Sequence, residues 1–170
     1  MIVIRRETAE DVAAVRVVNE RAFGQPAEAD LVDALRRGCA GALSFVATDE
    51  DVVGHILFTP ILVDGAAPSL VGMGLAPMSV LPDYQRRGVG SALVSRGLDA
   101  LRERGCPFVV VVGHPEYYPR FGFEPASKHG FLSQWQGMPD EAFMSLILNP
   151  SAMTGVSGVA RYRPEFDAAV

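Results

Sequence analysis

One segment of about forty residues most constrains how this chain can fold. It holds an apolar run at 74–81, a glycine turn, an amphipathic stretch at 88–104 and a second apolar run at 107–112. Apolar residues of the middle stretch recur at helical spacing, and Gly105 follows it as a helix terminator. A strand, a helix and a strand in this order form a βαβ unit, so the two apolar runs are predicted to be parallel strands.

The segments around this unit predict two N-terminal helices and further strands. Thr8 and Asp11 resemble a capping box that begins a helix, and Gly24 ends it; a second helix is expected from Pro26 to near Gly38. The expected strands, with branched and aromatic residues between turn signals, are 2–5, 43–48, 52–63, 142–148, the end of 115–123 after a short helix, and a last strand with a loose end in 155–166. We therefore predict an α/β fold with a mixed, partly antiparallel sheet.

Length and composition indicate one globular domain. The chain has 170 residues, of which 49% are hydrophobic and 21% charged, so we expect a single domain over 1–170, with 155–170 as a C-terminal strand and tail. No run of eighteen apolar residues predicts a membrane span, and the start lacks the order of a signal peptide, so a cytoplasmic protein is expected. The net charge of −5 argues against nucleic-acid binding, and Cys39 and Cys106 lack metal-ligand spacing, so no metal is expected.

The glycine turn, Gln85-Arg86-Arg87-Gly88-Val89-Gly90, has the features of an anion site. A helix N-terminus presents unpaired N–H groups, and glycine lets a ligand approach the backbone closely. Arg86 and Arg87 add positive charge, while Gln85 and Ser91 add donors. A glycine pair alone is also compatible with a tight strand-to-helix turn.

Two common phosphate-binding motifs do not fit this turn. The P-loop requires lysine after its last glycine, and here Ser91 follows Gly90. The dinucleotide fingerprint requires a third glycine where Leu93 stands. The occupant is therefore expected to be a phosphate group held by another type of loop.

Two motifs together resemble the GNAT superfamily of N-acetyltransferases. VLPDYQRRGVGSAL is similar to that family's Gln/Arg-x-x-Gly-x-Gly/Ala loop for acetyl-CoA, and YYPRFGF is similar to its Tyr-x-x-x-Gly-Phe element. The order of elements over 1–148 also agrees, and the resemblance is to small bacterial stand-alone members. It implies a mixed sheet with a splayed parallel strand pair and helices on both faces.

The resemblance implies roles for particular residues. The backbone of the strand residues Met78, Ser79 and Val80 would pair with the pantetheine arm of acetyl-CoA. The pyrophosphate would be wrapped by the loop residues Gln85, Arg86, Arg87, Gly88, Val89, Gly90 and Ser91. Tyr118, four residues before Gly122, would hydrogen-bond the sulfur and protonate the leaving thiolate. Pro77 is expected beside a bulge in the strand that precedes the loop.

The acceptor half of the reaction is less defined by the sequence. Acetyl transfer would proceed by direct attack of a primary amine, in a small molecule or a peptide, on the thioester in a ternary complex. Many family members place a glutamate on the strand before the loop, but 74–82 contains none, so the general base stays open. His55, His114 and Tyr117 are candidates for substrate contact, although a histidine within an apolar strand is more often structural. A homodimer is suggested by the resemblance alone.

Two other functions remain compatible with the same residues. A non-catalytic acyl-CoA-binding or sensing module would keep the loop without turnover. A protein that binds the phosphates of another nucleotide would use the same turn, and ADP or a dinucleotide would then compete as well as CoA does.

Overall fold

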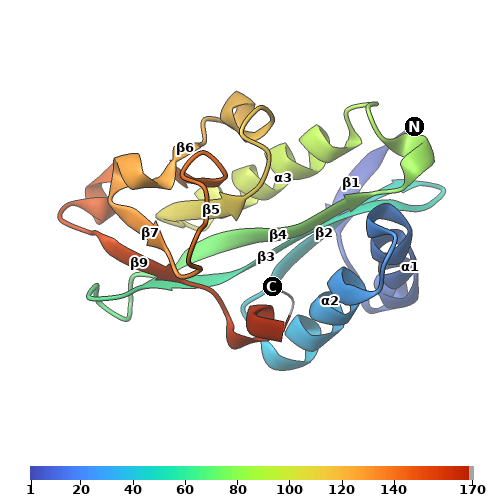
Figure 1. Cartoon of the computed structure of the whole chain (residues 1–170). Coiled ribbons are helices and arrows are strands. Elements are labelled where there is room, and N and C mark those ends of the chain that lie inside the picture. Colours follow the sequence, from blue (N-terminus) through green and yellow to red (C-terminus); the bar gives the residue numbers. More distant parts are fainter. Residues whose placement is uncertain (169–170) are drawn as a thin grey trace. The chain divides into compact units, whose positions relative to one another are not determined.

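A computed structural model of the chain describes residues 1–168, whose course is shown in Figure 1. These residues form two compact units. The first unit comprises residues 1–58, 76–100 and those from 164 on, and the second comprises residues 59–75 and 101–163. Three elements run from one unit into the other along the chain: β3 (Asp51–Val63), β4 (Gly72–Val80) and α3 (Val89–Glu103). A single domain over 1–170 stays a prediction.

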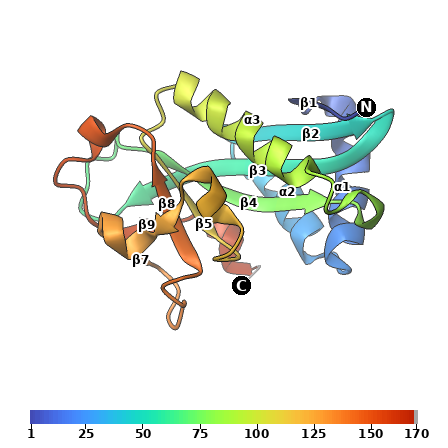
Figure 2. The ribbon, with the colours of Figure 1, turned by 90° about the horizontal axis from the view of Figure 1, so that it is seen from above.

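The first unit is a layered α/β structure. β1 (Val3–Arg6) pairs with β2 (Leu43–Asp49), and β2 pairs with β3, both antiparallel. In this unit, α1 (Val12–Phe23) and α2 (Ala27–Gly38) lie on one side of the strands and α3 on the other (Figures 1 and 2). Helices therefore cover both faces, as the family resemblance implies.

The ends of α1 follow the predicted signals. The backbone N–H of Thr8 donates to Asp11 Oδ2 at 2.7 Å, so the predicted capping contact is confirmed, and it begins a 3-10 turn, Ala9–Asp11, that leads directly into α1. Arg5 donates to both carboxylate oxygens of Asp11, at 2.7 and 2.9 Å, and these hydrogen bonds lower the pKa of Asp11 to about 2. Gly24 ends the helix in the left-handed conformation, with φ of 70°.

Small residues let α3 approach β3 closely in the first unit. A Cβ atom on Gly54 would lie 3.1 Å from Leu93 and 3.2 Å from Val89, and a Cβ atom on Gly97 would overlap the ring of Phe58. Larger side chains at either glycine would push the helix away from the strand. The close approach buries Leu93 and Phe58 completely.

His55 follows Gly54 in β3, so its side chain points to the opposite face of the strand, where it is fully buried. Its Nδ1 lies 3.2 Å from the side-chain nitrogen of Asn19 in α1, and its Nε2 lies 2.9 Å from Ser44 Oγ in β2. The Asn19 amide also donates to the carbonyl of Val15 at 3.0 Å. The amide is therefore the donor to Nδ1, and Nε2–H donates to Ser44. Burial lowers the pKa of His55 to about 4.

In the second unit, the beginning of β4 pairs in parallel with β5 (Phe108–Val112), as the βαβ pattern predicted. β5 also pairs antiparallel with β8 (Phe143–Ile147), which pairs with the two-residue β6 (Glu124–Pro125). The end of β3 pairs with β9 (Gly158–Arg161), and β9 pairs in parallel with β7 (Phe131–Ser133). The sequence did not predict β7, because three residues are too few for an alternating pattern to appear.

The C-terminal segment belongs to the second unit up to Arg163 and to the first unit from Pro164 on. The expected last strand is the four-residue β9, and a short 3-10 turn over Pro164–Ala168 follows it with Phe166 buried. The last two positions of the predicted tail, 169–170, lie outside the described residues. Within residues 1–168, no helix combines the length and the apolar character that crossing a membrane requires.

We expect His55 to make the free energy of unfolding depend on pH. Its folded-state pKa of about 4 lies below the ordinary value of 6.5, so its contribution is complete above pH 6.5 and is lost as the pH falls toward 4. The loss should approach about 1.4 kcal/mol per pH unit within that window. Urea denaturation of the wild type and of His55→Gln across this window measures it.

The difference between the two unfolding free energies should shrink as the pH falls. Parallel pH profiles for the wild type and His55→Gln would show that the buried imidazole does not couple to folding.

Candidate functional site

The loop between β4 and α3, residues 81–88, contains two left-handed residues and leads into the N-terminus of the helix. Arg86 and Gly88 both take left-handed conformations, with φ of 62° and 82°. A Cβ atom on Gly88 would meet nothing within 4 Å, so glycine is required there for its φ and not for space. The first backbone bond of α3 runs from Ala92 N–H to Gly88 O at 3.0 Å. The N–H groups of Val89 and Gly90 precede that bond, so no carbonyl of α3 accepts them.

Several hydrogen bonds hold this loop in place. Leu81 N–H donates to Val53 O at 2.9 Å, and the Gln85 side-chain amide donates to Val80 O at 2.9 Å. The Tyr84 hydroxyl donates to Asp49 Oδ2 at 2.9 Å, while the N-terminal ammonium of the chain contacts Asp49 Oδ1 at 3.0 Å. The N-terminal ammonium and then Tyr84 lower the pKa of Asp49 through these bonds. Gln85 thus uses its amide to fix the loop.

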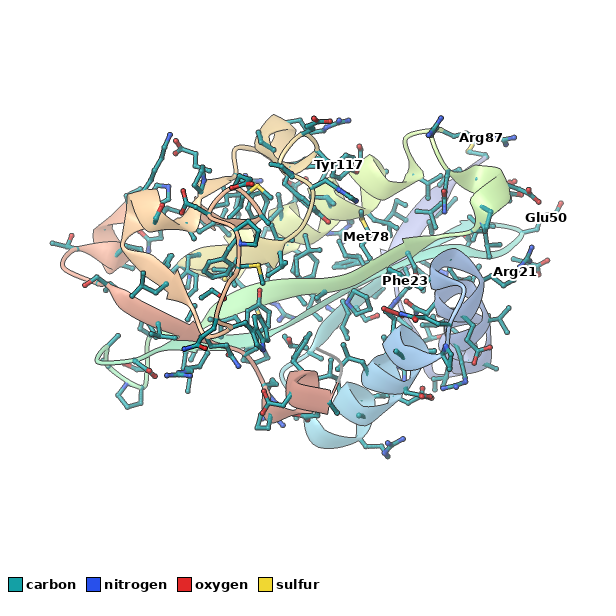
Figure 3. All side chains as sticks on the ribbon, viewed as in Figure 1. Arg21, Phe23, Glu50, Met78, Arg87 and Tyr117 are labelled. Atoms are coloured by element: carbon teal, nitrogen blue, oxygen red, sulfur yellow. The ribbon has the colours of Figure 1, made fainter. Side chains whose placement is uncertain are left out.

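The two arginines of the loop are exposed, and Arg87 lies close enough to Asp49 to help lower the pKa of that carboxylate. Arg87 projects from the turn before α3 (Figure 3), and its Cζ lies 5.5 Å from the centre of the Tyr84 ring. No ion pair joins Arg86 or Arg87 to an acidic side chain within residues 1–168. Two guanidinium groups and the positive end of α3 therefore create a local site for an anion, although the chain as a whole is acidic.

The strand that leads into this loop ends with Met78, Ser79 and Val80, the residues expected along the pantetheine arm. Ser79 is 3% exposed, and Met78 and Val80 are half-buried. The hydroxyl of Ser79 has no hydrogen-bond partner among the described residues. The peptide bond between Ala76 and Pro77 is cis, which the sequence did not predict.

In the second unit, Tyr118 begins a short 3-10 turn that ends at Phe121, and Gly122 follows with φ of 98°. The Tyr118 ring is 7% exposed and packs edge-on against Tyr117 and Phe123, with ring centres 5.0 and 5.7 Å away. A Cβ atom on Gly113 would overlap this ring, so glycine makes room for it. Burial, assisted by the neighbouring Tyr117, raises the pKa of Tyr118 to about 12. Its hydroxyl therefore stays protonated at neutral pH and can donate a hydrogen bond.

The candidates for substrate contact occupy different environments. His114 is exposed, and its carbonyl accepts the N–H groups of Tyr117 and Tyr118 at 3.1 and 3.4 Å. Tyr117 is half-buried, with Arg120 Cζ 4.3 Å from its ring centre. His55, by contrast, is buried with both ring nitrogens bound to protein side chains. His55 is therefore removed from the candidates for substrate contact, because burial and two partners make it the structural residue that a histidine within an apolar strand more often is.

The structure also shows functional neighbours that sequence reasoning missed. Tyr84 and Asp49 anchor the loop but lie 35 positions apart in the chain. The acidic turn at 49–51 was visible in the sequence, but nothing marked Tyr84 as its partner. Within residues 1–168, no three His, Cys, Asp or Glu side chains form a group suited to a metal ion.

Comparison with known proteins identifies the family to which this fold belongs. The family model described as an acetyltransferase (GNAT) domain matches residues 3–126. The Escherichia coli K12 N-acetyltransferase YhbS, itself uncharacterized, is 37% identical over 168 residues, covering 98% of this chain and 99% of that protein. A second protein from E. coli K12, the uncharacterized N-acetyltransferase YjhQ, is 42% identical over 154 residues, covering 85% of this chain and 84% of its own length.

Two solved structures are similar over nearly the whole chain. The crystal structure of E. coli YhbS in complex with CoA has a TM-score of 0.90 at 37% identity, covering 98% of this chain and 92% of that one. A GNAT family acetyltransferase from Brucella melitensis in complex with acetyl-CoA has a TM-score of 0.80 at 35% identity, covering 98% of this chain and 99% of that one. The predicted GNAT fold is confirmed, and this chain belongs to the GNAT family of acetyltransferases.

Proposed function

We propose that this protein is an acetyl-CoA-dependent N-acetyltransferase that transfers the acetyl group to a primary amine. Its family membership supports acetyl transfer, and two similar structures hold CoA and acetyl-CoA. The observation that carries the proposal is the loop before α3. There, Arg86 and Gly88 take left-handed conformations at the start of α3, and the two arginines form no ion pair within residues 1–168.

The loop is proposed to bind the diphosphate of acetyl-CoA, which the reaction consumes as a substrate. The N–H groups from Gly88 to Ser91 would donate to phosphate oxygens at the positive end of α3. Arg86 and Arg87 would add charge-assisted hydrogen bonds, and Gln85 would hold the loop by its bond to Val80 O. The backbone of Met78, Ser79 and Val80 would pair with the pantetheine amides, where β4 is expected to splay from its parallel neighbour.

The chemistry is direct transfer in a ternary complex. The lone pair of the amine forms a bond to the thioester carbonyl carbon, and a backbone N–H of β4 stabilises the negative oxygen that develops. The carbon–sulfur bond then breaks, the thiolate takes a proton from Tyr118, and the proton lost by the amine nitrogen returns to Tyr118 through water. The products are the N-acetyl amine and CoA. The protein contributes orientation and electrostatic stabilisation, with no covalent bond to a side chain.

Tyr118 is proposed to act on the departing sulfur. A pKa of about 12 keeps its proton available as a hydrogen-bond donor, whereas an ordinary thiol has a pKa of about 8.5. Complete proton transfer from Tyr118 to a thiolate would be unfavourable, because the two pKa values differ by about three to four. Tyr118 therefore first donates a hydrogen bond to the sulfur. The proton moves to the thiolate as desolvation raises the pKa of the thiol.

The amine itself is defined only by class, as a small-molecule or peptide amine. Residues 74–82 contain no glutamate to serve as a base, so the amine would enter neutral or lose its proton through water. His114 and Tyr117 remain candidates for contact with it. The same lack of a strand glutamate favours a second candidate function, a non-catalytic acyl-CoA-binding module. A cytoplasmic location and a homodimer stay predictions.

The double variant Arg86→Gln/Arg87→Gln should bind CoA about a hundredfold more weakly than the wild type, because two charge-assisted contacts are lost. Calorimetry at fixed salt measures the affinities. Arg21→Gln/Arg37→Gln removes the same charge from exposed positions outside the loop and should bind CoA within about twofold of the wild type. Equal losses in both double variants would mean that net charge, and not the loop, attracts the ligand.

Tyr118→Phe should lower kcat by about ten- to a hundredfold while the affinity for acetyl-CoA stays within about twofold, because only the sulfur loses its donor. Release of the CoA thiol over a panel of primary amines measures turnover. Tyr162→Phe, a matched change at another buried tyrosine, should retain the wild-type rate.

Unchanged turnover in Tyr118→Phe would remove this residue from the reaction. If CoA bound but no amine released thiol from acetyl-CoA, the non-catalytic module would replace the enzyme. If ADP or a dinucleotide competed as well as CoA does, the loop would belong to a different nucleotide-binding protein.

A further inference from the structure

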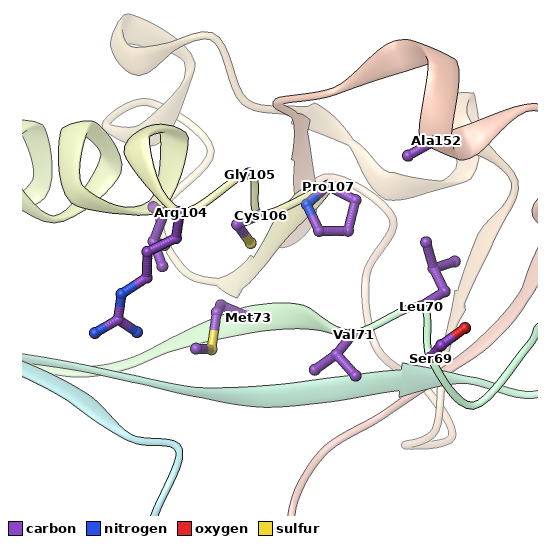
Figure 4. A pocket seen from close by; sticks show the side chains of 10 residues that line it. Ser69, Leu70, Val71, Met73, Arg104, Gly105, Cys106, Pro107 and Ala152 are labelled. Carbon is purple, nitrogen blue, oxygen red and sulfur yellow. The ribbon is translucent and has the colours of Figure 1, made fainter.

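The second unit contains a cavity of about 370 Å³ that no step of the proposed reaction uses. Its wall is mainly apolar, because six of its lining residues present aliphatic, thioether or proline side chains: Leu70, Val71, Met73, Leu101, Pro107 and Ala152. These residues come from the loop before β4, the beginning of β4, the end of α3, the turn that follows it and the C-terminal segment. Figure 4 shows Arg104 and Met73 at one end of the cavity and Leu70 and Ala152 at the other.

Arg104 is the only charged residue in this wall. No acidic side chain of residues 1–168 forms an ion pair with it. The nearby thiol of Cys106 is buried and already donates to Phe108 O at 3.3 Å. An unpaired guanidinium at one end of an apolar hollow is complementary to a molecule with an anionic head and an apolar body.

The hollow continues into a second one of about 310 Å³. The two share Ser69, Leu70 and Ala152, and the second is lined otherwise by residues 65–67 and 155–157, none of which is charged. We name the two together the Arg104 groove. Arg104 lines only the first hollow and Ala152 lines both, so a chain that starts at Arg104 and passes Ala152 would enter the second hollow.

We propose that the Arg104 groove binds an aliphatic carboxylate. The carboxylate contacts Arg104, and the hydrocarbon chain lies along Met73, Leu101 and Pro107 toward Leu70 and Ala152. A peptide fits less well, because its N–H and C=O groups need partners, and beyond Arg104 the first hollow offers only the Ser69 hydroxyl and the occupied Cys106 thiol as polar side chains. The proposal does not depend on acetyl transfer and can hold or fail independently of it.

Titration of the full chain with hexanoate, octanoate and decanoate tests the proposal. Calorimetry should show saturable binding that strengthens with chain length, by at most about three- to fourfold per methylene. Octylamine and octanol should bind at least about tenfold more weakly than octanoate, because they lack the anion. With methyl-labelled methionine, octanoate should shift the NMR signal of Met73, identified by its loss in Met73→Leu, and leave that of Met144 in place.

Two exposed positions provide variants that should fold normally. Arg104→Gln should weaken octanoate binding by about tenfold, whereas Arg37→Gln, a matched change on α2, should not. Ala152→Trp should weaken decanoate binding far more than hexanoate binding, because it blocks the path of the longer chain.

Several results would overturn the proposal. The proposal fails if none of the carboxylates gives detectable heat, or if octylamine or octanol binds as tightly as octanoate. It also fails if Arg104→Gln keeps the wild-type affinity for octanoate, or if octanoate shifts only the NMR signals of methionines other than Met73. Decanoate binding that Ala152→Trp leaves intact would place the chain elsewhere. An acetylated leucine dipeptide with a free carboxylate that bound more tightly than decanoate would assign the groove to peptides.

Discussion

The functional loop depends on one backbone constraint, the left-handed turn that carries the chain from β4 into α3. Gly88 adopts its φ of 82° without steric cost, but Arg86 at 62° pays about 1 kcal/mol for a conformation that non-glycine residues avoid. The anchoring bonds of Leu81, Tyr84 and Gln85 each contribute about 0.5–1.5 kcal/mol and together offset that strain. A fixed loop presents the N-terminus of α3 and two guanidinium groups before any ligand arrives, which reduces the ordering cost of binding.

Burial has opposite consequences at two titratable residues of this chain. At His55, desolvation lowers the pKa to about 4 and leaves a neutral ring whose two nitrogens tie α1 and β2 to β3. At Tyr118, desolvation raises the pKa to about 12 and keeps a proton on the hydroxyl. In both cases the uncharged form is favoured. The histidine thereby becomes part of the core, whereas the tyrosine gains a donor suited to a developing thiolate.

Much of the architecture could be predicted because its signals are local. Helix ends at Asp11 and Gly24 depend on side chains within one turn, and the parallel pair of β4 and β5 follows from the helix between two apolar runs. The loop was found in the same way, since its glycines and arginines are contiguous. Residue spacing alone did not distinguish a tight turn from a cofactor-binding loop. The family resemblance favoured the cofactor-binding loop.

What the sequence could not show depends on contacts between distant positions. His55 meets Asn19 across 36 positions and Ser44 across 11, and no pattern in its own strand reveals either partner. Tyr84 and Asp49 are similarly separated. Gln85 stays a predicted phosphate contact, and its amide also donates to Val80 O, a bond that no pattern in the loop reveals. Such outcomes follow from tertiary packing, which decides whether a polar side chain faces a ligand or the protein.

The central claim is that the start of α3, with its two arginines, grips the diphosphate of the coenzyme. Calorimetric titration with CoA, dephospho-CoA and pantetheine, side by side at one salt concentration, tests it most directly. Both diphosphate-containing compounds should bind, and pantetheine should bind at least about a hundredfold more weakly. Pantetheine binding as tightly as CoA, or no heat with CoA, would contradict it.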